Sequence, residues 1–182
     1  MYIIIAIIVV VGVILMGIYN RLVSLKNSVA NASADMDVQM KMRFDLVENL
    51  VNTVKWYATH EKDTLEKLTQ ARTQFLNAQS PADKAEADNM VSGTLKTLFS
   101  VAESYPDLKA NTNFLSLQTE LSNIENQIAG SRRYYNATIK EYNNAIMVFP
   151  NNLIANSFGF TSENSYFTIT DEAQKEAPKV QF

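Results

Sequence analysis

The first 19 residues constrain this chain more than any other feature. They read MYIIIAIIVVVGVILMGIY and contain no charged side chain. As an α-helix, residues 1–19 would extend about 28 Å at 1.5 Å per residue, close to the roughly 30 Å thickness of a bilayer's hydrocarbon core. We therefore expect a single transmembrane anchor at residues 1–19, with the lipid bilayer as a partner.

A cleaved signal peptide is the alternative interpretation of the same run. A signal peptide has a basic region before a shorter apolar stretch and a cleavage site built from small residues. No Lys or Arg precedes this run, and residues 16–19 (MGIY) make a poor cleavage site. The sequence therefore favours a retained anchor in the cell membrane.

The basic residues that follow the run predict an orientation. Positive charge close to a membrane span tends to remain on the cytoplasmic side. Arg21 and Lys26 follow the run closely. We expect the rest of the chain to lie in the cytoplasm, with a periplasmic or extracellular position as the alternative.

Composition limits the classes open to the remaining residues. About 160 residues suit one domain, and the five Gly and four Pro of the chain are widely spaced, which favours long helices. A net charge of −3 without a basic block argues against a nucleic-acid partner. Because the chain has no cysteine, disulfides, thiolate metal sites and thiol catalysis are excluded.

Apolar residues at steps of three and four predict a helical seam directly after the anchor. Leu22, Leu25, Val29, Ala32 and Met36 begin this seam. Because no Pro or Gly occurs between residues 21 and 80, we expect the membrane helix to continue into one long first helix over residues 20–78, bent or straight.

Two further long helices are predicted after this first one. Ser80, Pro81 and Asp83 have the spacing of a capping box with proline at the first helical position, and this second helix should end near residues 105–106. The third helix should begin at residues 111–113 and end at Pro150. Its seam is the most regular in the chain: Leu117, Leu121, Ile124, Ile128, Tyr135, Ile139, Tyr142, Ile146 and Phe149.

The C-terminal part should contribute one short element and a tail. Residues 151–157 are amphipathic, and Gly159 is a natural stop signal for a helix. Aromatic residues at positions 158, 160, 166 and 167 should dock on the bundle, with a short extended segment at residues 166–170. Residues 171–182 should be frayed. The predicted organisation is a transmembrane anchor at 1–19, a helical bundle at 20–160 and a tail at 161–182.

Motifs for catalysis and metal binding are missing from the sequence. His60 and Glu61 resemble the start of a zinc-protease motif, but position 64 is Thr and His60 is the only histidine. A di-iron bundle site fails for the same reason, because it needs two Glu-x-x-His pairs. Paired carboxylates such as Asp35 and Asp37, or Glu61 and Asp63, point to different sides of a helix and suggest solvated charge. We therefore predict no enzyme activity, no catalytic, metal or cofactor-binding residue and no cofactor.

Several polar residues lie close to the apolar seams. Gln39 and Arg43 fall near the seam of the first helix. Arg43 and Asp45 could be partly buried there, with Asp45 two and Glu48 five positions after Arg43. One reading is a polar site inside the bundle. We favour the other, an inter-helix ion pair that sets the register of packing. Arg132 and Arg133, beside Tyr134 and Tyr135, could contact lipid phosphate or a partner, but a solvated face with aromatic neighbours in the core is the more common arrangement.

Three blocks of residues resemble the LemA family, and the resemblance covers nearly all of the chain. The first block is Tyr19, Asn20, Leu22 and Val23. The second comprises Asp37–Gln39, Arg43, Asp45, Leu46, Asn49–Val51, Thr53–Lys55, Tyr57, Ala58, His60, Glu61, Thr64–Glu66, Ala71 and Arg72. The third comprises Tyr105–Ala110, Asn113, Phe114, Leu117, Gln118, Glu120, Leu121, Glu125, Ile128, Ala129, Arg132, Tyr135, Asn136, Tyr142, Asn143, Phe149, Pro150, Gly159 and Phe160.

The resemblance implies a short N-terminal membrane segment followed by an antiparallel helical bundle, and it implies no enzyme activity. The chain departs from the family pattern at Glu48, where proline is usual, and at Ser33, where tryptophan is frequent. Without that proline a straighter first helix is expected.

The sequence as a whole predicts an all-α, single-pass membrane protein with an elongated antiparallel bundle of three long helices. The expected function is that of a membrane-anchored scaffold that self-assembles through its bundle into a homo-oligomer. The alternative is a membrane-tethered sensor or adaptor that binds an unidentified protein partner. The homo-oligomer is expected because Phe114, Tyr134 and the tail aromatics exceed what a thin bundle can bury.

Overall fold

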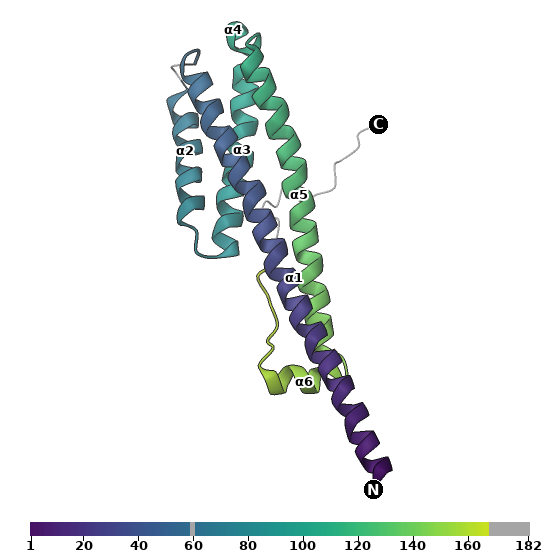
Figure 1. The fold of residues 1–182 in the computed structure, drawn as a ribbon. Coiled ribbons are helices and arrows are strands. Elements are labelled where there is room, and N and C mark those ends of the chain that lie inside the picture. The colour runs from purple at the N-terminus through teal and green to yellow at the C-terminus, as the bar shows by residue number, and fades with distance from the viewer. Residues whose placement is uncertain (59–60, 168–182) are drawn as a thin grey trace, which may run out of the picture.

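The computed structural model describes residues 1–58 and 61–167, and over these ranges the chain is all-α, with no strand. Figure 1 shows an elongated molecule from which the N-terminal part of the first helix projects alone. The helices are α1 (Tyr2–Lys55), α2 (Lys62–Asn77), α3 (Pro81–Ala102), α4 (Pro106–Lys109), α5 (Thr112–Met147) and α6 (Asn151–Phe158).

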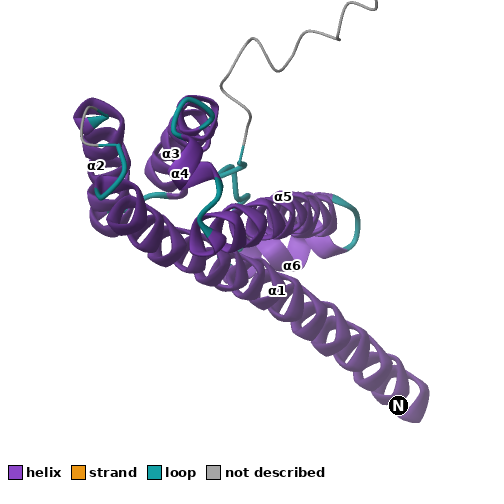
Figure 2. Ribbon diagram, turned by 90° about the horizontal axis from the view of Figure 1, so that it is seen from above, coloured by secondary structure: helices purple, strands orange, loops and turns teal. Residues whose placement is uncertain are grey.

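The four longer helices run alternately up and down. The two principal packing pairs are α1 with α5, and α2 with α3. In Figure 1 all four lie together in the upper half of the molecule, whereas further down α5 packs against α1 without the α2–α3 pair. Short α6 contacts both α1 and α5 near the lower end, and Figure 2 shows it beneath α5. The prediction of an antiparallel helical bundle from which an N-terminal helix projects is thus confirmed.

The prediction of one first helix over residues 20–78 is wrong. The chain leaves α1 after Lys55 and reverses into α2 at Lys62, so the bundle has four long helices instead of three. The reversal lets Phe75 of α2 stack on Phe44 of α1, with ring centroids 4.5 Å apart. It also buries Leu65 and Leu68. An unbroken helix would have left these side chains in water, so tertiary burial overrides the lack of a helix breaker.

The helix caps agree well with the sequence. Ser80 forms the complete capping box with Asp83, and Pro81 is the first residue of α3. Asn111 caps α5 by accepting a hydrogen bond from the Phe114 amide at 3.0 Å. Gly159 ends α6 with φ of 73°, a left-handed conformation that glycine adopts without strain. The single-turn helix α4 was not predicted.

The seam of α1 is buried as predicted from Leu22 to Val54, except that Leu25 and Leu46 are only partly buried. The seam of α5 is buried from Leu121 to Ile146. Phe149 departs from the prediction, because it is 79% exposed beyond the end of α5. Phe114 is also corrected: it is buried against Phe99, with ring centroids 6.1 Å apart, and so does not add to the exposed surface.

The tail docks on α5 through two asparagine side chains. Asn136 donates to the carbonyl of Phe167 at 2.8 Å and accepts from its amide at 3.0 Å. Seven residues further along α5, Asn143 donates to the carbonyl of Glu163 at 2.7 Å and accepts from its amide at 2.9 Å. Each asparagine therefore pairs with the backbone of an extended chain as a neighbouring strand would. Residues 168–170 of the predicted extended segment and residues 171–182 lie outside the described residues.

Candidate functional site

The N-terminal part of α1 is the first candidate site, because its apolar side chains find no cover in the bundle. Met1 to Val11 and Val13 to Met16 are exposed, and Ile3 reaches 76%. By length and composition α1 is the one described helix that could cross a membrane. Burial begins only at Ile18 and Leu22. This part of α1 is compatible with membrane anchoring.

The second candidate lies inside the bundle, where three helices contribute charged side chains. We call this group the charge cluster: Arg43 of α1, Asp88 of α3, and Glu125 and Arg132 of α5. Arg43 is 1% exposed and Asp88 is fully buried, which is rare for charged residues unless they are paired.

Arg43 is the centre of the charge cluster. One terminal nitrogen, Nη1, donates to Asp88 Oδ1 at 2.6 Å, and the other, Nη2, lies 2.7 Å from Glu125 Oε2. Nη2 also donates to Ser92 Oγ at 2.9 Å. Through these contacts a single side chain connects α1, α3 and α5.

Arg132 closes the cluster from the opposite side. Its Nη2 pairs with Asp88 Oδ2, so that Asp88 lies between two arginines. The guanidinium carbon lies 5.9 Å from the centre of the Phe167 ring, which places the docked tail over this side of the cluster. Phe167 in turn packs edge-on against Tyr135, at 5.6 Å between centroids.

Electrostatics favour a structural role for the charge cluster. Its two arginines and two acids sum to zero charge. Burial lowers the pKa of Arg43, an effect partly offset by Glu125, and burial together with the charge of Arg43 lowers the pKa of Arg132. Arginine nevertheless keeps its proton in proteins, so neither side chain is a proton donor for catalysis. The cluster can fix which helix faces lie together.

The structure confirms that Arg43 forms inter-helix ion pairs, with Asp88 of α3 and Glu125 of α5. Asp45 is exposed, and Glu48 pairs with Arg72 of α2 at 2.8 Å. Arg132, expected on a solvated face, belongs to the cluster, whereas Arg133 and Tyr134 are exposed and Tyr135 is buried.

Sequence reasoning missed Asp88 and Glu125. Asp88 precedes Val91 and Leu95 by three and seven positions, so it lies on the apolar face of α3. Arg132 likewise follows Ile128 by four. A charged residue at the spacing of an apolar seam is therefore the sequence signal that could have indicated a buried charge.

The remaining predicted polar residues are dispersed. Gln39 is half-buried, and Asp35 and Asp63 are exposed. Asp37, expected to be solvated, pairs with Lys84 of α3 at 2.5 Å. His60 lies outside the described residues, and among the residues described no three His, Cys, Asp or Glu side chains come together as metal ligands do.

The upper corner of the bundle is held by side chains from the α1–α2 turn. Tyr105 donates to Glu61 Oε1 at 3.1 Å, and Asn111 donates to the hydroxyl of Tyr57 at 3.0 Å. These contacts tie the reversal of the chain to the start of α5, so the polar residues at this corner have a structural explanation.

The comparison with known protein families decides the affiliation. The model of the LemA family matches residues 32–182. The chain belongs to the LemA family. A curated relative, Protein LemA of Metamycoplasma hominis, is 31% identical over 140 residues, covering 75% of this chain. The aligned part spans 63% of the relative's own length.

Most residues of the charge cluster also belong to the blocks that carry the resemblance to the LemA family. Arg43, Glu125 and Arg132 all lie in the residue blocks that carry the resemblance to the LemA family, and Tyr57, Glu61 and Tyr105 of the upper corner do so as well. The apolar part of α1 lies before the matched region, which begins at residue 32. The LemA match therefore covers the bundle from residue 32 onward, together with the tail.

Proposed function

We propose that this LemA-family chain is a membrane-anchored scaffold that self-assembles through its bundle and has no catalytic activity. The observation that carries the proposal is the continuity of α1. The exposed apolar run and one wall of the bundle are the same 54-residue helix. Anchoring the run in a bilayer therefore holds the bundle close to the membrane.

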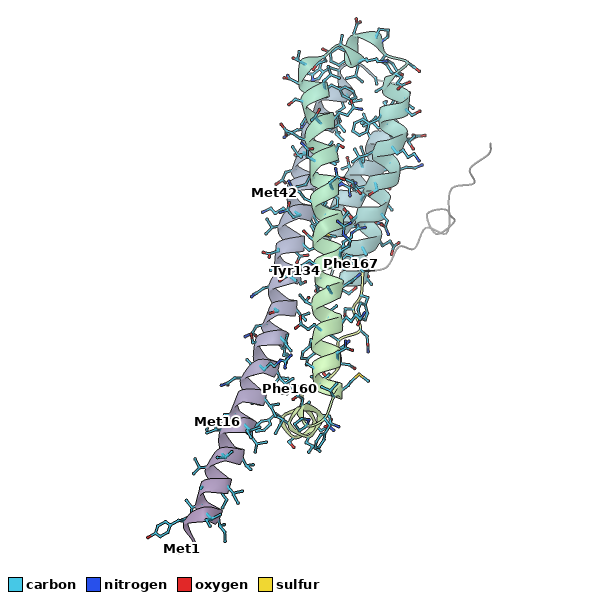
Figure 3. The ribbon with its side chains drawn as sticks, turned by 90° about the vertical axis from the view of Figure 1, so that its right-hand side faces the viewer. Met1, Met16, Met42, Tyr134, Phe160 and Phe167 are labelled. Atoms are coloured by element: carbon cyan, nitrogen blue, oxygen red, sulfur yellow. The ribbon has the colours of Figure 1, made fainter. Side chains whose placement is uncertain are left out.

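Self-assembly is supported by apolar side chains that the bundle leaves uncovered. Val38 and Met42 are one turn apart on α1, and each is about half exposed; Tyr134 on α5 is 58% exposed. Figure 3 labels Met42 and Tyr134 well above the projecting N-terminal part of α1. Anchored chains share one orientation in two dimensions, which raises their effective concentration and favours lateral, rotationally symmetric contacts.

The bundle is proposed to lie in the cytoplasm. Arg21 and Lys26 closely follow the apolar run, and positive charge close to a span tends to remain on the cytoplasmic side. Protease added to intact spheroplasts should leave the bundle uncut, and lysis should expose it. Digestion of the bundle before lysis would place it outside the cytoplasm.

Single-cysteine cross-linking tests the scaffold directly, because the native chain has no cysteine. Val38→Cys, Met42→Cys and Tyr134→Cys replace exposed side chains, so each variant should fold. In membranes treated with a mild oxidant or a short bis-maleimide, at least one of them should form covalent dimers or a ladder of higher species.

Two matched variants interpret the result. Lys67→Cys places the thiol on the exposed polar face of α2 and should remain monomeric. Val9→Cys reports on the span. Cross-links at Val9→Cys alone would restrict association to the span, and a monomer at every position, supported by light scattering in several detergents, would contradict the scaffold and favour the sensor or adaptor.

A further inference from the structure

Near the lower end of the bundle, a surface separate from the N-terminal apolar run exposes large apolar side chains. We call residues 147–160 the α6 segment. It lies within a 21-residue stretch, Tyr142 to Ser162, that contains no charged residue. Its exposed large side chains are Met147 at 72%, Val148 at 52%, Phe149 at 79%, Leu153 at 58% and Phe158 at 63%. Apolar side chains gathered in this way mark an interaction surface.

The α6 segment lies beside the place where α1 leaves its apolar run. The ring of Tyr19, the last residue of the run, is 4.9 Å from the ring of Phe158 and 5.8 Å from that of Phe160. Figure 1 shows α6 lying across α1, and Figure 3 shows Phe160 beside α1 just above Met16. Below this level only the N-terminal part of α1 continues.

The bundle holds the α6 segment firmly in this position. Ile154 and Ala155 are buried against the bundle, and Asn151 donates to the carbonyl of Ala145 at 3.0 Å. After the left-handed Gly159, the amide of Phe160 donates back to the carbonyl of Ala155 at 2.9 Å. The outward apolar side chains are therefore presented by a fixed element and not by a loose loop.

We propose that the α6 segment lies in the headgroup region of the same bilayer that holds α1, as a second membrane contact. This inference rests on the proposed anchor. From Tyr2 to Tyr19 the helix rises about 26 Å at 1.5 Å per residue, so a spanning run places Tyr19 at the edge of the hydrocarbon core. Phe158 touches Tyr19, and it must then lie at that edge as well.

The composition of the α6 segment suits this location. Exposed Phe and Leu side chains enter the boundary between headgroups and acyl chains to a depth of about 5–10 Å, where uncharged polar side chains such as Asn156 and Ser157 remain hydrated. Two contacts, a span and a surface helix, would fix the rotation and tilt of the bundle relative to the membrane. A span alone leaves both free.

Tryptophan quenching by brominated lipid tests the proposal with the full-length chain. The chain has one tryptophan, Trp56, which is 86% exposed at the far end of α1. In a Trp56→Phe background, Phe149→Trp and Leu153→Trp report on the α6 segment, and Ile8→Trp reports on the span. Each variant is reconstituted into phosphatidylcholine vesicles without bromine, with bromine on the upper part of the acyl chains, and with bromine near their ends, where residue 8 of a spanning helix would lie.

We expect the tryptophans introduced at positions 149 and 153 to lose much of their emission to brominated lipid, while Trp56 of the native chain keeps nearly all of its own. Quenching at position 8 without quenching at 149 and 153 would overturn the surface contact and leave the anchor intact. Lack of quenching at position 8 would overturn the anchor and this inference with it. Blue-shifted but unquenched emission at 149 and 153 would mean that a second copy covers the segment, which also contradicts the proposal.

Discussion

At the scale of single residues, the charge cluster shows how much one side chain can determine. Arg43 contacts Asp88, Ser92 and Glu125 at the same time. A buried ion pair gains little over a well-packed apolar pair, because desolvation opposes the attraction between the charges. Removing one partner is different, since it leaves the other charge buried without compensation.

Replacing Arg43 by Ala should therefore destabilise the protein strongly. Fully buried Asp88 would lose one of the two arginines that pair with it and keep Arg132, and a cavity would open beside it. We expect a loss of about 3–5 kcal/mol in the free energy of unfolding, the range for a broken buried pair. Denaturant unfolding of the full-length chain in detergent micelles, followed by circular dichroism, measures this loss.

Two other arginine and acid variants serve as controls. Arg72→Ala breaks the exposed pair with Glu48, and Glu125→Gln alters a side chain that is 45% exposed. Arg72→Ala should change the free energy of unfolding by less than about 1 kcal/mol, as the loss of an exposed ion pair does. Glu125→Gln should cost less than Arg43→Ala, because buried Arg43 keeps Asp88 as a partner. If Arg43→Ala proved as mild as Arg72→Ala, the cluster would not hold the helices together.

The same residues show what a single sequence can predict about the site. Arg43 was singled out because a charge at an apolar position of a seam is unusual. Its partners, Asp88 and Glu125, are 45 and 82 positions further along the chain, and no local pattern relates them. Only the packing of α3 and α5 against α1 brings these three side chains together.

At the scale of helices, the sequence predicts the ends of a helix well where a capping residue marks them. The capping box at Ser80, the cap at Asn111 and the stop at Gly159 are local hydrogen-bonding devices, and the structure has all three. The end of α1 after Lys55 has no such signal, since neither Gly nor Pro is near. That end depends on the burial of α2 against α1, which is a property of the folded bundle.

Periodicity has a similar limit at the end of α5. Phe149 continues the three-and-four spacing of the seam, and on spacing alone it belongs to the core. The helix ends at Met147, so residue 149 no longer follows the helical phase and its side chain points away from the core. The apolar residue left over at this helix end is part of the surface that we assign to the membrane.

At the scale of the whole molecule, α1 has two different environments along one axis. Residues 2–17 are exposed throughout or nearly so, whereas Leu22 is completely buried. The hydrophobic run at the start could be recognised from composition, and the all-α bundle from periodicity. The sequence did not show that α5 and α6 reach down to the level of Tyr19, because that depends on how the helices align.

Deleting residues 2–17 should therefore leave a folded helical domain that stays in solution without detergent. The deletion removes no residue of the core, and it keeps Tyr19 in contact with Phe158. Circular dichroism should show a strongly helical spectrum with a cooperative thermal transition. A disordered or sheet-rich spectrum would contradict the fold.

A longer deletion, of residues 2–30, is the matched comparison. It removes Leu22 and Val29 from the core, and it removes Tyr19, which contacts Phe158 of α6. Losing one fully buried leucine costs about 2–5 kcal/mol, so the transition midpoint should fall well below that of the shorter deletion. Equal midpoints for the two deletions would mean that the pairing of α1 with the lower part of α5 and with α6 does not contribute to stability. The bundle would then depend on its upper four helices alone, and the position of α6 beside the membrane would lose its structural support.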